Sequence, residues 1–351
     1  MFDFRLSSDV RDITANTINF KSGSSVILPY ELNHLCDLRA DWQTIEVLSD
    51  KGFTLRQLIQ LLDKGIVECG RGNAIFPWLA RHYFESQFSA NEKALPFIAW
   101  LTLPTPKLVW LGVPHTNLVD LRHSTATGLA AIVDALPQNA PIIGILPELE
   151  PNTRCANNIA SMARLSINCD FKLGVLGGDH RATWSLLSVL KETCSIKSVR
   201  YVHIDAHHDL YGIDGVGGSI GVYHSNFLID LLRSCYVDQV LLLGCRDRTE
   251  PVLFAQQQGF DIQQIETASE INGSTMHTHL SIDIDVLEPS LFSGVSSPLG
   301  KGWSLEKLLG TVSDVAKTVK VDSVSVVEAG SNCPNTILAV VNLVKLLEKM
   351  L

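Results

Sequence analysis

Apolar runs that alternate with helical patterns constrain the fold of this chain more than any other feature. Residues 107–114, 171–176 and 199–204 are apolar at most positions, and stretches with helical spacing follow them, as over 182–190. A strand that is apolar on both faces is buried on both faces, which is typical of a parallel sheet covered by helices. The sequence therefore predicts an α/β domain whose site lies beyond the carboxyl ends of the strands.

The first 95 residues follow a different pattern. Short β-like segments at 16–20 and 25–28 flank a turn, and a further strand is expected at 66–68. The helical stretches between them cover 29–38, 41–52 and 54–65. Three short helices followed by a β wing predict a small winged-helix-like domain. The expected organisation is a module over 1–95, a Pro-containing linker over 96–106 and a larger domain over 107–351.

Charge argues against nucleic acid as the partner of either part. The whole chain has a formal net charge of −9, and the first 95 residues are also slightly acidic. A module that reads DNA is usually basic, so we expect residues 1–95 to bind a peptide or protein. A structural cap on the larger domain is the alternative.

Composition also bears on the compartment. No apolar run approaches the ~18–20 residues that span a bilayer, and the first residues lack the basic and apolar regions of a signal peptide. The eight cysteines are scattered without a C-x-x-C pair, which is typical of thiols in a reducing compartment. We therefore expect a cytoplasmic protein that makes no contact with membranes.

Acidic residues and histidines follow the predicted strands directly. The four groups are Gly177-Gly178-Asp179-His180, Asp205-Ala206-His207-His208-Asp209, Asp283-Ile284-Asp285 and Glu328. Residues two apart in extended chain point the same way, so the alternate members of each group converge. We expect six ligands: His180, Asp205, His207, Asp209, Asp283 and Asp285. Asp179 is expected to orient its loop or to support the ligands, and His203 and His208 are expected either to pack or to support the ligands. His277 and His279 are expected to lie in the sheet.

Four carboxylates in one pocket repel each other unless cations lie among them. Four carboxylates and two imidazoles exceed what one zinc ion takes, and they suit two ions that share carboxylates. Mainly oxygen donors with some imidazole favour Mn²⁺. Two such ions lower the pKa of a water toward neutrality and so provide a nucleophile.

The first three of these groups, which contain the six expected ligands, resemble the metal motifs of the arginase/agmatinase (ureohydrolase) family. The likeness covers about residues 107–351. The resemblance implies the arginase-like three-layer α/β fold, two Mn²⁺ ions and hydrolysis of a guanidinium group to urea and an amine. It implies one metal held by His180, Asp205, Asp209 and Asp283. It implies a second metal held by His207, Asp205, Asp283 and Asp285.

Two further residues match functional positions of the family. Glu328 matches the glutamate that binds the guanidinium, where a carboxylate pairs with the planar fork of N–H donors. His224 matches the histidine that moves a proton to the departing amine, a role that suits a group with a pKa near neutrality.

Departures from the family pattern bear on the substrate. Thr249 stands where enzymes of free arginine carry an acid for the α-ammonium group, and Leu210-Tyr211-Gly212 and a glycine-rich loop over 215–221 replace polar residues that hold the amino acid. We therefore expect an arginine side chain within a peptide, converted to ornithine, as in the peptide arginases that the chain most resembles. Agmatine or another small guanidine is an alternative, and a non-catalytic metal-binding scaffold is another. Related enzymes are oligomers, so we expect a homo-oligomer.

Overall fold

The computed structural model describes most of the chain after residue 107 and short pieces before residue 70. The described residues are 3–7, 10–14, 17–27, 43–44, 47–48, 51, 53, 61, 66–69, 108–116, 125–137, 140–146, 148–168, 171–194, 196–215, 221–330 and 333–351.

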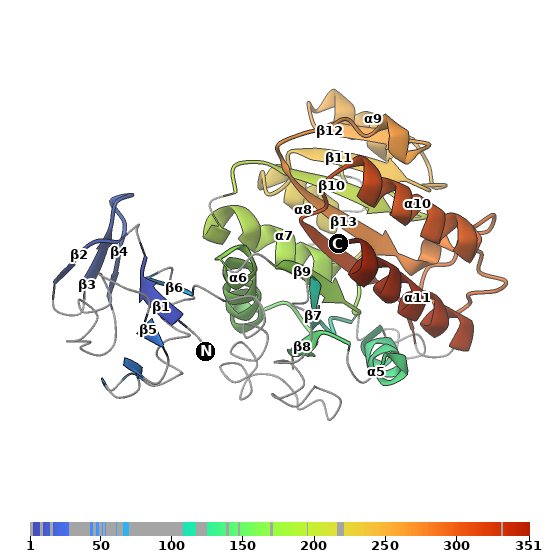
Figure 1. Cartoon of the computed structure of the whole chain (residues 1–351). Helices are drawn as coiled ribbons and strands as arrows, with labels where there is room; N and C mark the ends of the chain where they lie inside the picture. Colours follow the sequence, from blue (N-terminus) through green and yellow to red (C-terminus); the bar gives the residue numbers. More distant parts are fainter. Residues whose placement is uncertain are drawn as a thin grey trace.

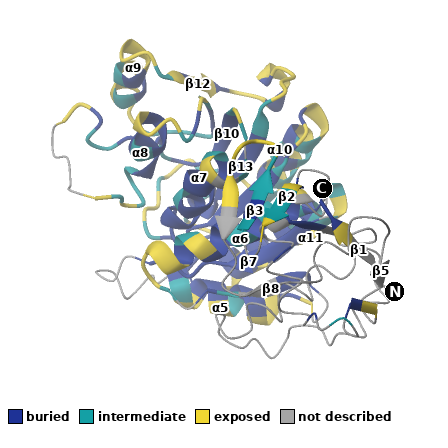
Figure 2. Ribbon diagram, turned by 90° about the vertical axis from the view of Figure 1, so that its left-hand side faces the viewer, coloured by how far each residue is buried: buried dark blue, intermediate teal, exposed yellow. Residues whose placement is uncertain are grey.

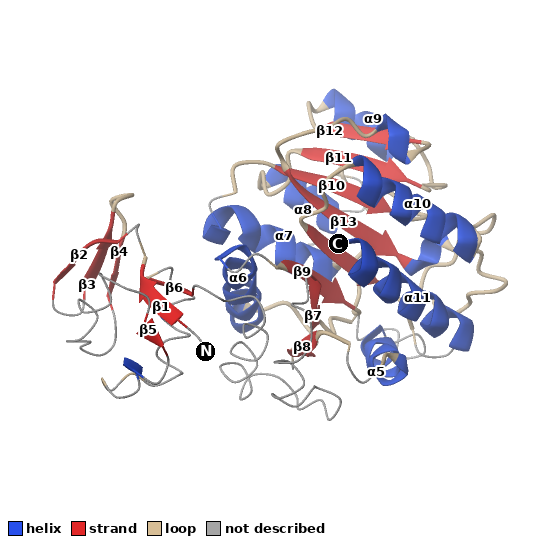
Figure 3. Cartoon of the chain, in the orientation of Figure 1, coloured by secondary structure: helices blue, strands red, loops and turns tan. Residues whose placement is uncertain are grey.

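An eight-stranded sheet forms the centre of the larger part (Figures 1 and 3). Its strands in spatial order are β12 (Asp261–Ile265), β11 (Gln239–Leu243), β10 (Val199–Ile204), β13 (His277–Asp283), β14 (Ser323–Val327), β9 (Lys172–Leu176), β7 (Leu108–Gly112) and β8 (Ile142–Ile145). All neighbouring pairs are parallel, so every strand ends at the same edge. This confirms the predicted parallel sheet.

Helices cover both faces of this sheet. One face packs on α6 (Thr153–Asn168), α7 (Arg181–Cys194), α8 (Phe227–Arg233) and α9 (Glu250–Gln257). The other packs on α5 (Thr125–Ala135), α10 (Leu305–Thr318) and α11 (Pro334–Met350).

Side chains of a single strand divide between the two cores. Val109 and Leu111 of β7 join the first core, and Leu108 and Trp110 join the second, since successive side chains point to opposite faces. Figure 2 shows the strands β10 and β13 in the colour of buried residues. The expected three-layer architecture is therefore present.

The described residues of the first 69 form two small antiparallel sheets rather than a winged helix. The order of one is β5 (Gln43–Thr44), β1 (Asp3–Leu6) and β6 (Val67–Cys69), and that of the other is β2 (Val10–Thr14), β3 (Thr17–Phe20) and β4 (Ser25–Ile27). The hairpin β3–β4 and the strand β6 match the sequence expectation.

The winged-helix prediction is not confirmed in the part that can be compared. Residues 47–48 and 61 are helical within two of the expected helices, but the strands differ from the expected ones. Strand β5 lies inside the helix expected at 41–52, and strands β1 and β2 were not expected. A two-residue strand depends on its partner, here β1, more than on its own pattern, so local spacing favoured a helix. The helix expected at 29–38 lies outside the described residues, as does nearly all of the helix at 54–65.

Among the described residues, none of the helices is both long enough and apolar enough to span a lipid bilayer.

Candidate metal centre

Four adjacent strands deliver the predicted site residues to one edge of the sheet. His180 follows β9, Asp205 follows β10, Asp283 ends β13 and Glu328 follows β14. These strands are neighbours in the order β10, β13, β14 and β9. The sheet therefore brings together side chains that lie up to 148 residues apart in the chain, the separation of His180 and Glu328.

Unusual backbone conformations position several of these groups. Gly178 has φ of +76°, and a Cβ there would lie 2.2 Å from the carbonyl oxygen of Val113. Only glycine fits that turn, which leads directly into His180. Asp209 and Glu328 also have positive φ, of 52° and 64°. Non-glycine residues in this region are strained, and such strain concentrates at functional sites.

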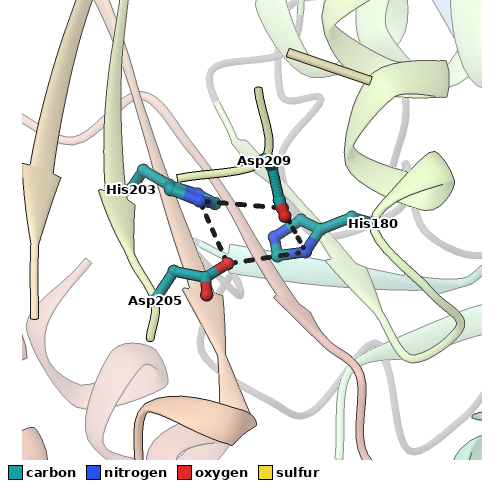
Figure 4. A group of neighbouring side chains, drawn as sticks. All are labelled: His180, His203, Asp205 and Asp209. Atoms are coloured by element: carbon teal, nitrogen blue, oxygen red, sulfur yellow. Dashed lines mark ion pairs between the residues drawn. The ribbon is translucent and has the colours of Figure 1, made fainter. Parts of the chain in front are cut away.

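The first half of the site surrounds the Nδ1 atom of His180. That atom lies 3.1 Å from Asp283 Oδ2, 3.3 Å from Asp209 Oδ2 and 3.7 Å from Asp205 Oδ2. All four residues are buried, with at most 6% of their surface exposed. Figure 4 shows His180, Asp205 and Asp209 turned toward one another together with His203.

The second half surrounds the Nδ1 atom of His207. It lies 2.8 Å from Asp285 Oδ2 and 3.5 Å from Asp205 Oδ1. One oxygen of Asp205 thus faces His207 and the other faces His180. This is the placement that a carboxylate shared by two metals requires.

Backbone amides hold the carboxylates in place. The N–H of His207 donates to Asp205 Oδ1 at 2.6 Å, and the N–H of Asp285 donates to Asp283 Oδ1 at 2.7 Å. The N–H of Ala206 donates to Asp285 Oδ1 at 3.2 Å. These bonds fix the carboxylates and leave their other oxygens free to face the middle of the site.

The protein alone does not balance the charge of this site. Burial and neighbouring carboxylates raise the pKa of Asp209 and Asp283 well above the usual range, and they raise the pKa of Asp285 to about 6. Burial acts in the same direction on Asp205, but the nearby histidines outweigh it and lower the pKa of that carboxyl. Burial lowers the pKa of His180 to about 3, so its imidazole is neutral at pH 7.

Orphaned atoms show that a cation fits among these residues. Asp205 Oδ2, Asp209 Oδ2 and His203 Nε2 are buried and have no hydrogen-bond partner. Buried polar atoms without partners are costly, and a metal satisfies such a set. Three groups of possible ligands occur among the described residues: His180, His203, Asp205 and Asp209; His180, Asp283 and Glu328; and Asp205, His207 and Asp285.

A cavity of about 380 Å³ opens onto both halves of the site, around His180 and around His207. It is lined by His180, His207, Asp209, Tyr211, His224, Ser225, Asp283, Asp285, Ser296, Ser297 and Glu328. Glu328 accepts from the N–H of His180 at 3.0 Å and from the Ser296 hydroxyl at 3.2 Å. Helix α8 begins at Phe227, so His224 lies in the turn before it.

Other predicted residues lie around the site rather than in it. Asp179 is paired with Arg181 at 2.7 Å, and Arg181 also contacts Glu150. His208 Nε2 faces Asp247 at 3.3 Å. His277 and His279 lie in β13, as expected.

Sequence reasoning left the role of His203 open and missed Ser296. His203 was expected either to pack in the sheet or to support the ligands, and its Nε2 lies 3.0 Å from Asp205 Oδ2. Its position two residues before Asp205 in the same strand was a signal, because alternate side chains share a face. Ser296 belongs to a loop without any regular pattern, so no comparable signal existed for it.

Comparisons with known proteins identify a family and related sequences. The family model described as the arginase family matches residues 146–347. The mitochondrial arginase 1 of Oryza sativa subsp. indica is 27% identical over 148 residues, which cover 38% of this chain and 42% of that protein. An N(1)-aminopropylagmatine ureohydrolase of Thermus thermophilus is 27% identical over 171 residues, which cover 46% of this chain and 55% of that protein. The chain thus matches only about half of the length of these relatives.

Solved structures share the fold. The arginase of Medicago truncatula superposes with a TM-score of 0.58 at 20% identity, over 88% of this chain and 99% of that one. The proclavaminate amidino hydrolase of Streptomyces clavuligerus gives a TM-score of 0.54 at 20% identity, over 71% of this chain and 95% of that one. The family match spans more than half of the chain and includes every strand that carries a ligand, and on this basis the chain belongs to the arginase family.

Proposed function

We propose that this protein is a dimanganese ureohydrolase that converts an arginine side chain of a peptide to ornithine with release of urea. The carrying observation is a cavity lined by Glu328 and by five of the six expected ligands, His180, His207, Asp209, Asp283 and Asp285. The sixth, Asp205, lies beside both His180 and His207. In the overall reaction, water adds to the guanidinium carbon, the bond from that carbon to the side-chain nitrogen breaks, and the amine leaves with a proton.

The six ligands would hold two Mn²⁺ ions. Asp205 faces both halves of the site, and Asp283, near His180 and next to Asp285, is the second candidate for sharing. When bound, the two ions would lower the pKa of a water toward neutrality, which a guanidinium demands because it is a poor electrophile.

Glu328 is the proposed binding residue for the cationic substrate. Burial and the nearby Asp179 raise the pKa of Glu328 well above its usual range. A guanidinium within hydrogen-bonding distance reverses this effect, since an opposite charge favours the ionised carboxylate. A charge-assisted pair of hydrogen bonds would also orient the guanidinium plane over the metals.

His224 is the proposed proton carrier. Burial lowers the pKa of its imidazole, so the ring is neutral at pH 7 and is able to accept a proton. Once protonated it is a stronger acid than a free imidazolium, because the same environment disfavours its charge. It is therefore suited to deliver that proton to the departing amine.

The rim of the cavity supports a substrate without a free amino-acid head group. The Tyr211 hydroxyl and His208 both contact Asp247, so this acid is already engaged. Thr249 supplies no charge beside it. The alternative of a small guanidine has support of its own, because the Thermus relative is named for aminopropylagmatine.

Urea release tests the proposal directly. Protein loaded with Mn²⁺ should release urea from an arginine-containing peptide and much less from free arginine or agmatine. Turnover of agmatine alone would replace the peptide with a small guanidine. Two bound ions without urea from any substrate would favour the scaffold.

Residues 1–95 are proposed as the peptide-recognition module, 96–106 as the linker and 107–351 as the catalytic domain. Deletion of residues 1–95 should lower kcat/KM for the peptide partner and spare urea release from a short arginine peptide. Equal kcat/KM for both proteins on the peptide partner would exclude the recognition role. We also propose that the protein is cytoplasmic and forms a homo-oligomer. Light scattering of the purified protein would test whether it assembles.

A further inference from the structure

His203 presents an unpartnered nitrogen to the metal centre. The side chain is fully buried, with 0% of its surface exposed, and it lies on β10 two residues before Asp205. Its Nε2 atom is 3.0 Å from Asp205 Oδ2 and 3.8 Å from Asp209 Oδ2 (Figure 4). None of these three atoms has a hydrogen-bond partner, although Nε2 and Asp205 Oδ2 are close. The two atoms are thus within the distance of an ion pair.

The other ring nitrogen of His203 is occupied. The Tyr201 hydroxyl lies 2.8 Å from His203 Nδ1, and both residues are fully buried. If Nδ1 carries the proton and donates it to Tyr201, the Nε2 lone pair points into the site. Histidines that bind metals generally use one nitrogen for the metal and fix the other through such a hydrogen bond.

His180 is arranged in the same way. Its Nδ1 faces the carboxylates, and its Nε2 lies 3.4 Å from the Ser281 hydroxyl. The two imidazoles thus approach the site from different elements, His180 from the loop after β9 and His203 from β10, each with its far nitrogen next to a buried hydroxyl. The donors of His180, His203, Asp205 and Asp209 all lie within 4.8 Å of one another, as the ligands of a single ion do.

The geometry points to His203 as a further protein ligand, through Nε2, of the metal held by His180, Asp205 and Asp209. This inference rests on the metal centre of the proposed function and adds a nitrogen donor to it. The extra imidazole makes this ion richer in nitrogen than its neighbour at His207. Metal selectivity should differ between the two positions for that reason.

The test is metal binding by the full chain carrying His203→Asn. An asparagine amide keeps a polar group near the Nδ1 position beside Tyr201 and removes the donor at Nε2. Calorimetric titration with Mn²⁺ should show two ions in the unchanged protein. In the variant, the affinity for one ion should fall by at least about 100-fold, above the 10–100-fold that loss of a supporting residue typically costs.

His279→Asn is the matched control. His279 is also fully buried, lies on the adjacent strand β13 and stacks on Tyr201 at 5.9 Å between ring centroids. Its two nitrogens contact the hydroxyls of Ser323 and Ser325 instead of the metal site. This variant suffers a similar loss of buried hydrogen bonds, so its affinity for both ions should stay within a few-fold of the original.

Pulsed EPR on protein loaded with one equivalent of Mn²⁺ gives a second readout. The nitrogen couplings should fall by one imidazole in His203→Asn and stay the same in His279→Asn. Unchanged couplings would overturn the inference and leave His203 as a hydrogen-bond donor to Asp205. Two ions bound by His203→Asn with unaltered affinity would overturn it as well. Urea release is measured separately, so a failure of the proposed activity does not affect this result.

Discussion

The proposed binding of the guanidinium depends on one side chain, that of Glu328. Its left-handed backbone and its bonds to the His180 amide and Ser296 aim the carboxylate into the cavity. Because a substrate cation would pair with it, we expect Glu328→Gln to lower kcat/KM by about 10–100-fold, as hydrogen bonds to charged groups contribute about 1.5–3 kcal/mol. Metal content should remain unchanged. Steady-state kinetics and metal analysis measure the two quantities.

Glu348→Gln is the control for this substitution. Glu348 is a partly buried glutamate on α11 whose pKa is also raised by burial. It does not line the cavity, so its substitution should leave KM unchanged. A loss of metal in Glu328→Gln would instead make Glu328 a ligand, in line with its position beside His180 and Asp283.

His115 makes the stability of the protein depend on pH. Burial lowers the pKa of its imidazole from 6.5 to about 4. The unfolded chain therefore binds more protons than the folded one between these values, and stability falls as pH falls through this window. His115→Gln removes this contribution. The loss of unfolding free energy between pH 7 and pH 5 should be smaller in the variant by on the order of 2 kcal/mol.

Urea denaturation at both pH values measures this difference. The comparison between proteins cancels the other buried histidines, such as His277 and His279, whose pKa is also lowered by burial. Parallel curves of stability against pH for the two proteins would contradict the assignment to His115.

The loop between β9 and α7 is the element on which the position of His180 depends. Gly178→Ala puts a Cβ at 2.2 Å from the Val113 carbonyl and also strains a left-handed φ. We expect lower stability and weaker Mn²⁺ binding together, since the loop must shift and it carries a ligand. Thermal unfolding and calorimetric titration report the two effects.

Gly259→Ala separates the steric contact with Val113 from the strain of a left-handed backbone. Gly259 has a similar φ of +87°, but a Cβ there would contact nothing within 4 Å. Its substitution should cost only the left-handed strain of about 1–2 kcal/mol, with unchanged metal affinity. Equal effects of both substitutions would show that steric contact with Val113 is unimportant.

The elements differ in how well their sequence predicts them. Strand β10 has the predicted bounds of 199–204 because all six of its residues are buried. The edge strand β12 reads Asp-Ile-Gln-Gln-Ile, with only its isoleucines buried, so it lacks the apolar run by which central strands are found. Helix α11 is rich in valine and leucine, and composition alone does not distinguish such a helix from a strand.

The same reasoning applies to the site. The convergence of the candidate ligands at the ends of β9, β10 and β13 was predictable because parallel strands end at one edge. The role of Ser296 beside Glu328 depends on how a long loop folds back, which local pattern does not encode. The strands β1 and β5 were not foreseen, because short antiparallel strands are stabilised by partners distant in sequence.

At the scale of the whole molecule, we expect metal binding and folding to be coupled. The site draws ligands from β9, β10 and β13, which lie near the centre of the sheet, and it places several carboxylates where they repel one another. An ion that binds only the folded chain stabilises it by about 2.7 kcal/mol when its concentration is 100 times Kd. Repulsion among the carboxylates adds to the cost of removing it.

We therefore expect chelation to lower Tm by several degrees and Mn²⁺ to restore it. Differential scanning fluorimetry with and without chelator measures the shift and needs no substrate. Asp283→Asn provides the control, because it removes a ligand and part of the repulsion at once. Its metal-free form should unfold at a higher Tm than the metal-free original and should gain little from Mn²⁺. An unchanged Tm of the original protein after chelation would contradict the coupling, since four buried carboxylates would then be tolerated without a cation.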